Sequence, residues 1–248
     1  MFQVNKGQEY FANLQRVLTR IGSEQSNNME RAAELIADAL ENGKKVFAFG
    51  TGHSHMLAEE LFYRAGGLVQ IRPILETSLM LHESASKSTK LERLGDYGEI
   101  LFEQYGIEKG DVLLLFSNSG RNGVSIDLAL LSQKNGVSTI VITNMEHTMS
   151  GASRHPSGKK LYECATVAID NCGCLGDACV TIDGIGRKVS PTSTAAGAAI
   201  LNAVTARSIE IMVNRGFVPE IFASSNVDGG DEINEAYVRK YIKEIKSL

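Results

Sequence analysis

Two short segments rich in glycine and small hydroxyl residues carry the side chains best suited to chemistry. The first is Gly50-Thr51-Gly52-His53-Ser54, and the second is Ser117-Asn118-Ser119-Gly120-Arg121-Asn122. Each follows a short apolar run and precedes a segment with helical spacing. A helix N-terminus presents unpaired N–H groups and partial positive charge, and serines add hydroxyl donors at little steric cost. The pattern therefore predicts binding of a phosphate dianion.

Other interpretations of these loops are weaker. An isolated Ser-x-Ser-Gly is most often turn and N-cap chemistry, but here it follows an apolar run and is preceded by a similar loop earlier in the chain. Dinucleotide binding is less favoured because Gly50-x-Gly52 lacks the third glycine of that fingerprint. A P-loop is excluded because no Gly-Lys-Ser/Thr follows either loop.

Short apolar runs alternate with helix-spaced segments through the middle of the chain. The expected strands lie at 46–49, 71–75, 112–116, 139–143 and 165–170. The expected helices include 56–64, 124–134 and a long, alanine-rich one at 194–214. Strands that are apolar on both faces and alternate with helices are typical of a parallel sheet covered on both sides. Ligands of such sheets bind at the carboxyl ends of the strands, where both loops would meet.

The chain is predicted to form one domain, 1–248. Residues 1–42 form two helices, with a break at Gly22 and an N-cap at Ser23. Residues 43–215 form the core, and 216–248 form a C-terminal loop and helix. The polar stretch 78–98 is expected to be an excursion near the site or a mobile loop.

Composition limits the classes of partner. The chain has 248 residues, a net charge of -4 and no tryptophan, so binding to nucleic acid is not expected. It lacks a signal-peptide core and a run of about 18 apolar residues, which predicts a cytoplasmic protein without membrane contact. The four cysteines, all within 164–179, lack Cys-x-x-Cys spacing and are expected to be reduced thiols.

Three segments together resemble the SIS (sugar isomerase) domain: Gly50–Ser54, Ala58–Leu61 and Phe116–Asn122. Their order and spacing are similar to those of phosphoheptose isomerases, over roughly residues 30–215. The whole chain is most similar to a bacterial family of SIS-domain proteins of unassigned activity. The resemblance implies an α/β fold, a three-layer αβα sandwich with a five-stranded parallel flavodoxin-like sheet, to which residues 1–42 add an N-terminal helical extension. It also implies a homodimer or homotetramer.

The resemblance further implies that the partner is a phosphorylated sugar held by the two loops. A third contribution is expected from the helix start Ser190–Thr194, which independently has the pattern of a capped helix N-terminus. The predicted phosphate- and sugar-binding residues are Gly52, Ser54, Ser117, Asn118, Ser119, Gly120, Asn122, Ser193 and Thr194.

Aldose–ketose isomerisation needs a base to move a proton between adjacent carbons and an acid for the oxygens. Glu60 is the main candidate because its position in Ala58–Leu61 resembles that of the catalytic glutamate of phosphoheptose isomerases; the alternative is a solvated helix face. Glu76 directly follows an apolar strand and is a second candidate. His53 and His55 are candidate acids, and His53 is favoured because it lies inside the first loop.

Neither a metal nor another cofactor is expected. Phosphoheptose isomerases carry a histidine ligand one turn before that glutamate, where this chain has Met56, and the stretch Ala195–Asn202 lacks the histidine of their late helix. Three further features remain open. Arg154–Lys160 is predicted to be solvated surface, with anion binding as the alternative; Asn226–Glu232 is predicted to be a turn; and His82 and His147 belong to no defined constellation.

Two classes of function follow. The first is a sugar-phosphate isomerase, and the second is a non-catalytic phosphosugar sensor or binding module that uses the same loops. A lyase acting on an amino-sugar phosphate is a third, related possibility. The sequence does not identify the sugar.

Overall fold

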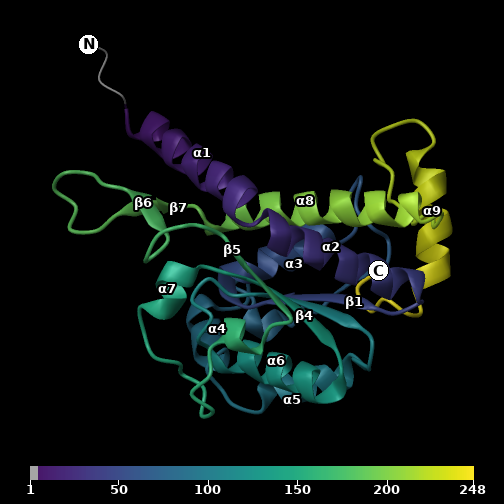
Figure 1. Cartoon of the computed structure of the whole chain (residues 1–248), viewed down its shortest axis with the longest axis horizontal. Coiled ribbons are helices and arrows are strands. Elements are labelled where there is room, and N and C mark those ends of the chain that lie inside the picture. The colour runs from purple at the N-terminus through teal and green to yellow at the C-terminus, as the bar shows by residue number, and fades with distance from the viewer. Residues whose placement is uncertain (1–4) are drawn as a thin grey trace.

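The computed structural model of the chain describes residues 5–248, and a parallel five-stranded sheet lies at its centre (Figure 1). The strands are β1 Val46–Gly50, β2 Ile71–Pro73, β3 Val112–Phe116, β4 Ser138–Thr143 and β5 Val167–Asp170. They pair in the order β2-β1-β3-β4-β5, which is the flavodoxin-like order. The predicted α/β sandwich is therefore confirmed.

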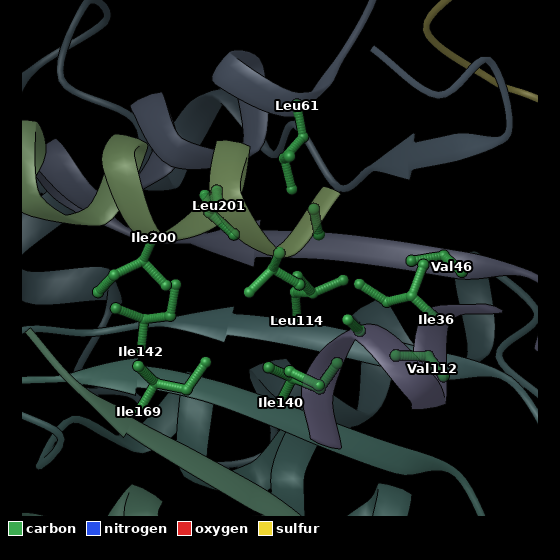
Figure 2. Close-up of a cluster of buried hydrophobic side chains, with 14 of the residues drawn as sticks. Ile36, Val46, Leu61, Val112, Leu114, Ile140, Ile142, Ile169, Ile200 and Leu201 are labelled. Atoms are coloured by element: carbon green, nitrogen blue, oxygen red, sulfur yellow. The ribbon is translucent and has the colours of Figure 1, made fainter. Parts of the chain in front are cut away.

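The strands alternate their side chains between two hydrophobic cores, as a sheet covered on both faces requires. In β3, Val112 and Leu114 join a core with helices α2 (Ser26–Glu41), α3 (Met56–Leu61) and α8 (Ser193–Asn214). Figure 2 shows this core, in which Ile36 of α2 and Ile200 of α8 lie against the strands.

The second core lies on the opposite face of the sheet. Leu113 and Leu115 of β3 pack there against α5 (Tyr97–Gln104) and α6 (Gly123–Asn135). These two helices lie below the sheet in Figure 1, whereas α2, α3 and α8 lie above it.

The N-terminal extension consists of α1 (Lys6–Glu24) followed directly by α2. The predicted break at Gly22 and cap at Ser23 are wrong: α1 continues through both residues, and the chain turns at Gln25. The Ser23 hydroxyl instead donates to the carbonyl of Thr19 at 3.1 Å. Glycine inside a helix costs only about 1 kcal/mol relative to alanine, which a long helix tolerates.

Two other segments differ from their predicted form. Helix α3 ends at Leu61, because Phe62 is extended and Tyr63 has a positive φ of 47°. The polar stretch after β2 folds into the 3₁₀ turn η2 (Thr77–Leu79) and helix α4 (Ala85–Leu91). Ser88 anchors α4, since its buried hydroxyl donates to the carbonyl of Leu79 at 2.7 Å.

An antiparallel hairpin that the sequence pattern does not predict follows β5. It consists of β6 (Ala178–Val180) and β7 (Val189–Pro191). The hairpin lies along α1, where Asn13 donates to the carbonyl of Cys179 at 2.8 Å. It projects at the same end of the molecule as α7 (Met145–Met149) and the start of α8, at the left of Figure 1.

The C-terminal segment returns to the opposite end of the sheet. Residues 224–230 form turns that lead into α9 (Gly230–Tyr241), in accord with the turn predicted at Asn226–Glu232. Tyr241 packs in a small cluster with Phe222 and Val69. Beyond α9, Glu244 accepts a salt bridge from Arg72 of β2 at 2.8 Å.

Helix α8 is long and apolar enough, by length and composition, to cross a membrane. In this fold it is a core helix, because Ile200, Leu201 and Val204 are buried against α2, α3 and the sheet. Its composition is therefore weak support for a membrane span.

Candidate functional site

A pocket opens at the carboxyl edge of the sheet, where the loops after β1, β3 and β5 meet the start of α8. Its enclosed part is small, about 20 Å³ for the centres of water-sized molecules, and the rest is open to solvent. Its lining consists of His53, Ser54, Leu57, Ser117, Asn118, Ile142, Asn171, Ser193 and Thr194. The two predicted loops and the predicted helix start therefore meet at one place. Gly52, Ser119, Gly120 and Asn122 belong to the same loops but do not line this pocket.

The first loop folds tightly over the end of β1. A Cβ at Gly50 would lie 2.4 Å from the carbonyl oxygen of Ser54, so only glycine permits this approach. The 3₁₀ turn η1 (Gly52–His55) then leads into α3. It places His53 at the exposed mouth of the pocket and Ser54 deeper inside. Within residues 5–248 the Ser54 hydroxyl has no hydrogen-bond partner, so it is free to contact a ligand.

The second loop turns back on itself through Ser117. The N–H of Gly120 donates to the Ser117 hydroxyl oxygen at 3.1 Å. Because that oxygen accepts a hydrogen bond, the hydroxyl proton is available to donate to a ligand. Gly120 has a φ of 59°, and a Cβ there would lie 2.7 Å from the hydroxyl oxygen of Thr148. A side chain at this position would therefore displace the loop.

Side chains from the end of β4 and from α7 fix the backbone of the second loop. The hydroxyl of Thr143, at the end of β4, donates to the carbonyl of Ser117 at 2.7 Å. The hydroxyl of Thr148, on α7, donates to the carbonyl of Ser119 at 2.9 Å. Both threonines are fully buried. This support fixes the loop backbone while the Ser119 side chain stays half-exposed beside the pocket.

A chain of asparagine side chains connects the ends of β3, β4 and β5. Asn171 donates to the side-chain oxygen of Asn118 at 2.7 Å, and Asn144 donates to that of Asn171 at 2.9 Å. With its oxygen occupied, Asn118 has its NH₂ group left for a ligand. Asn144 and Asn171 were not predicted from the sequence, although each directly follows an expected strand, which is the signal that would have found them.

A carboxylate of the protein itself binds the start of α8. The carboxylate of Asp177, in the loop before β6, accepts hydrogen bonds from the N–H groups of Thr192 and Ser193 at 3.0 and 2.8 Å. It also accepts the hydroxyl of Ser193 at 2.5 Å. Asp177 therefore occupies donors that the sequence assigned to a phosphate, whereas Thr194 faces the pocket without such a partner within residues 5–248.

Asn122 lies at the N-cap of α6, but its side chain makes no capping hydrogen bond. Its oxygen instead accepts from the guanidinium of Arg154 at 3.0 Å. The basic loop Arg154–Lys160 thus contacts the second loop. The segment is therefore not solvated surface alone, and its binding of an anion stays a prediction.

Three of the predicted acid–base residues lie in different surroundings. His53 lines the pocket. Glu60 faces α8, where its carboxylate accepts from Asn202 at 2.8 Å and pairs with Arg64. Glu76 accepts the hydroxyl of Ser78 at 2.8 Å. Neither glutamate belongs to the pocket lining.

Comparison with protein families matches residues 9–144 to the SIS domain. The chain belongs to the SIS-domain family. It is 42% identical over 240 residues to a UPF0309 protein of Geobacillus thermodenitrificans, covering 97% of this chain and 96% of that protein. It is 43% identical over 233 residues to a UPF0309 protein of Listeria innocua, covering 94% of each. The chain is therefore also a member of the UPF0309 proteins.

Solved structures support the SIS fold of this chain. A phosphoheptose isomerase from Francisella tularensis superposes with a TM-score of 0.55 at 16% identity, covering 84% of this chain and 98% of that one. A phosphoheptose isomerase from Neisseria gonorrhoeae gives 0.53 at 15% identity, covering 83% and 96%. At these identities the similarity establishes the fold and not the reaction.

Other histidines of this SIS domain lie apart from the pocket lining. His55 is buried below the first loop, where its ring contacts the carbonyl of Gly52 and lies 6.0 Å from the ring of His82. The N–H of His147 donates to Asn144 at 2.7 Å, so His147 helps to fix the asparagine chain through its backbone.

The described part of the chain, residues 5–248, contains no group of three His, Cys, Asp or Glu side chains that could hold a metal ion. The expectation of no metal stays a prediction. All four cysteines are free thiols. Burial raises the pKa of Cys172 to about 11, and the neighbouring Asp170 carboxylate adds to this effect. Since the thiolate is the nucleophile and metal ligand, Cys172 is chemically quiet at neutral pH.

Proposed function

We propose that this SIS domain binds a phosphorylated sugar at the carboxyl edge of its sheet and interconverts the aldose and ketose forms. One observation carries the proposal: hydroxyl and amide donors from Ser54, Ser117 and Asn118 converge on one pocket with the start of α8. A phosphate needs several donors at once, and hydrogen bonds to a charged acceptor are stronger than neutral ones.

The electrostatics of the neighbouring elements support an anionic ligand. The second loop leads into α6, a helix of 13 residues with no acidic residue in its first turn. Its N-terminus therefore contributes partial positive charge, and one of its N–H groups, that of Val124, donates to the carbonyl of Glu92 at 3.4 Å. The net charge of the chain is -4, so attraction of the phosphate must come from this local arrangement.

Turnover requires a group that moves a proton at the sugar carbons. His53 is the titratable residue of the pocket lining, which makes it the first candidate in this proposal. Glu60 and Glu76 remain proposed bases on the strength of sequence position, although each accepts hydrogen bonds from neighbours outside the lining.

The second proposal, a non-catalytic sensor or binding module, rests on the same pocket. Its supporting observation is that no carboxylate of residues 5–248 lines the pocket. A binding module needs donors for the phosphate but no base. Formation of the isomeric sugar phosphate, followed together with exchange of the sugar C–H proton with solvent deuterium, separates the two proposals, because a binding module catalyses neither.

We also propose that the protein is cytoplasmic and assembles as a homodimer or homotetramer. Phe11 and Leu18, seven residues apart on α1, are 71% and 38% exposed. Helix α1 projects from the body of the domain (Figure 1). Apolar surface of this kind is commonly covered in an assembly. Light scattering of the purified protein measures the number of copies.

The test of phosphosugar binding compares sugar phosphates with the same sugars lacking phosphate. At about 100 times its dissociation constant, a bound sugar phosphate should add about 2.7 kcal/mol to the free energy of unfolding. Ser119→Ala should remove part of this gain, whereas Ser86→Ala, on the exposed face of α4, should keep it. Equal stabilisation by both classes of sugar would show that the phosphate is not recognised.

A further inference from the structure

Three arginines gather beside the second loop. Arg121 belongs to that loop, Arg154 begins the basic loop, and Arg93 follows α4. Among residues 5–248, no carboxylate lies within 4.0 Å of any of their guanidinium nitrogens. Burial lowers the pKa of Arg154 from its usual value, and the charges of Arg93 and Arg121 lower it further. The cluster is therefore a concentration of positive charge without ion-pair partners.

The basic loop is fixed across the second loop at both of its ends. The N–H of Arg154 donates to the carbonyl of Arg121 at 3.0 Å, and the N–H of Leu161 donates to that of Gly120 at 2.9 Å. Between them, the ring of His155 pairs with Asp127 of α6 at 2.7 Å, and both of these side chains are nearly buried. This anchoring distinguishes the basic loop from a freely solvated run of charge.

The anchored backbone brings one guanidinium group to the beginning of α6 and leaves a second one against Gly151, just after α7. Arg154 donates to the side-chain oxygen of Asn122, the N-cap residue, at 3.0 Å. Arg121 packs against the backbone of Gly151, where an added Cβ would lie 2.8 Å from its guanidinium. The Nε of Arg121 is buried and has no hydrogen-bond partner within residues 5–248.

The carboxylate of Glu92, which lies in this region, does not neutralise the charge. Glu92 lies close enough to raise the pKa of Arg154 slightly against the larger opposing effects. Its carboxylate, however, accepts the hydroxyl of Thr51 at 2.8 Å. Like charges brought together and a buried unpaired donor both cost free energy, and an anion bound among the arginines would offset both costs.

We propose that Arg154 and Arg121, supported by Arg93, form an anion subsite that takes the phosphate of the ligand as its dianion. The inference rests on the proposed function and deepens it. Ser117, Ser119 and the α6 N-terminus contact one side of the phosphate, and the guanidinium groups contact the other. The ligand class is then a phosphate monoester, because a singly charged sugar acid leaves most of the arginine charge uncompensated.

Inorganic phosphate is the probe, and its dissociation constant is measured by calorimetry in Arg154→Gln and Arg121→Gln. Loss of a charge-assisted hydrogen bond should weaken binding about 10- to 100-fold in each variant. Arg154→Lys should recover part of the affinity, since it keeps the charge but lacks the planar fork. Arg239→Gln, on an exposed pair with Glu235, is the matched control and should bind as the parent does.

The pH dependence provides a readout that a purely structural role would not change. Affinity of the parent should rise as the probe passes to its dianion, near pH 6 to 7 for a phosphate. The rise should be smaller in Arg154→Gln. Thermal unfolding of each variant shows whether it is folded.

The outcomes separate this inference from the proposed function. If Ser119→Ala weakens sugar-phosphate binding while both arginine variants bind phosphate as the parent does, the subsite is wrong and the phosphosugar site stands. If the parent binds neither inorganic phosphate nor any sugar phosphate, both the subsite and the proposed function are wrong.

Discussion

The carboxylate of Asp177 accepts the hydroxyl of Ser193 at 2.5 Å and the backbone N–H of the same residue at 2.8 Å. Asp177 comes from the loop before β6, so the hairpin that projects beside α1 also supplies the anion at the start of α8. Ser193 lines the proposed phosphosugar pocket. A fixed negative charge therefore lies behind Ser193, outside the lining of a pocket that is proposed to bind a dianion.

Asp177→Asn should raise the affinity for a sugar phosphate and lower the stability of the fold. Removing one negative charge near the phosphate should strengthen binding about three- to tenfold. Loss of the charge at the helix start should cost about 0.5–2 kcal/mol. Calorimetry and denaturant unfolding measure the two effects. Asp183→Asn, exposed in the same hairpin, is the control, and an unchanged affinity in Asp177→Asn would contradict the electrostatic role.

The sheet was predictable because its signals are local. Runs such as Val112–Phe116 are apolar throughout and are followed by turn residues, so both the strand and its buried faces could be inferred. The boundary between α1 and α2 could not be predicted, because a glycine such as Gly22 is compatible with the interior of a helix that its other residues stabilise. The hairpin also escaped prediction, since β6 and β7 are three residues each and depend on packing against α1.

Gly120→Ala should weaken ligand binding more than its loss of stability explains. The residue has a φ of 59°, and the new Cβ would approach the hydroxyls of Thr148 and Thr143 at 2.7 and 3.0 Å. Strain in this backbone region and the steric contact together should cost about 1–3 kcal/mol of stability. The displaced loop should also lose contact with the phosphate.

The matched control is Gly136→Ala. Gly136 has a similar φ of 70° but ends α6 far from the pocket, and its added Cβ would meet only the flexible side chain of Lys109. It should lose stability through backbone strain and keep its affinity. Urea unfolding and calorimetry on both variants make the comparison, and parallel losses of affinity would show that the effect is general destabilisation.

The candidate site was predictable to the extent that it lies in contiguous loops. Ser54, Ser117 and Asn118 line the pocket because each follows a strand whose carboxyl end can be located from sequence. What a side chain faces depends on tertiary contacts. Glu60 lies on the predicted helix, yet its direction is set by Asn202, 142 residues later in the chain. No pattern within α3 encodes that partner.

His53→Asn should lower turnover more than Glu60→Gln. His53 lines the pocket, whereas the Glu60 carboxylate is engaged by Arg64 and Asn202 outside the lining. If His53 transfers the proton, its loss should reduce turnover about 10²- to 10⁴-fold with little change in affinity. Exchange of the sugar C–H proton with deuterium, followed by NMR, measures the proton transfer itself. Glu59→Gln, on the exposed side of α3, is the control and should exchange at the parent rate.

The pattern across these variants identifies the base. Exchange that stops in Glu60→Gln but persists in His53→Asn would contradict the assignment to His53 and return the role to the glutamate, as its sequence position suggests. Loss in both would indicate that the proton transfer requires both residues. If the parent shows neither exchange nor formation of the isomeric product with any sugar phosphate that it binds, the pocket serves a binding module, because an aldose–ketose interconversion through an enediol must move that proton and form the isomer.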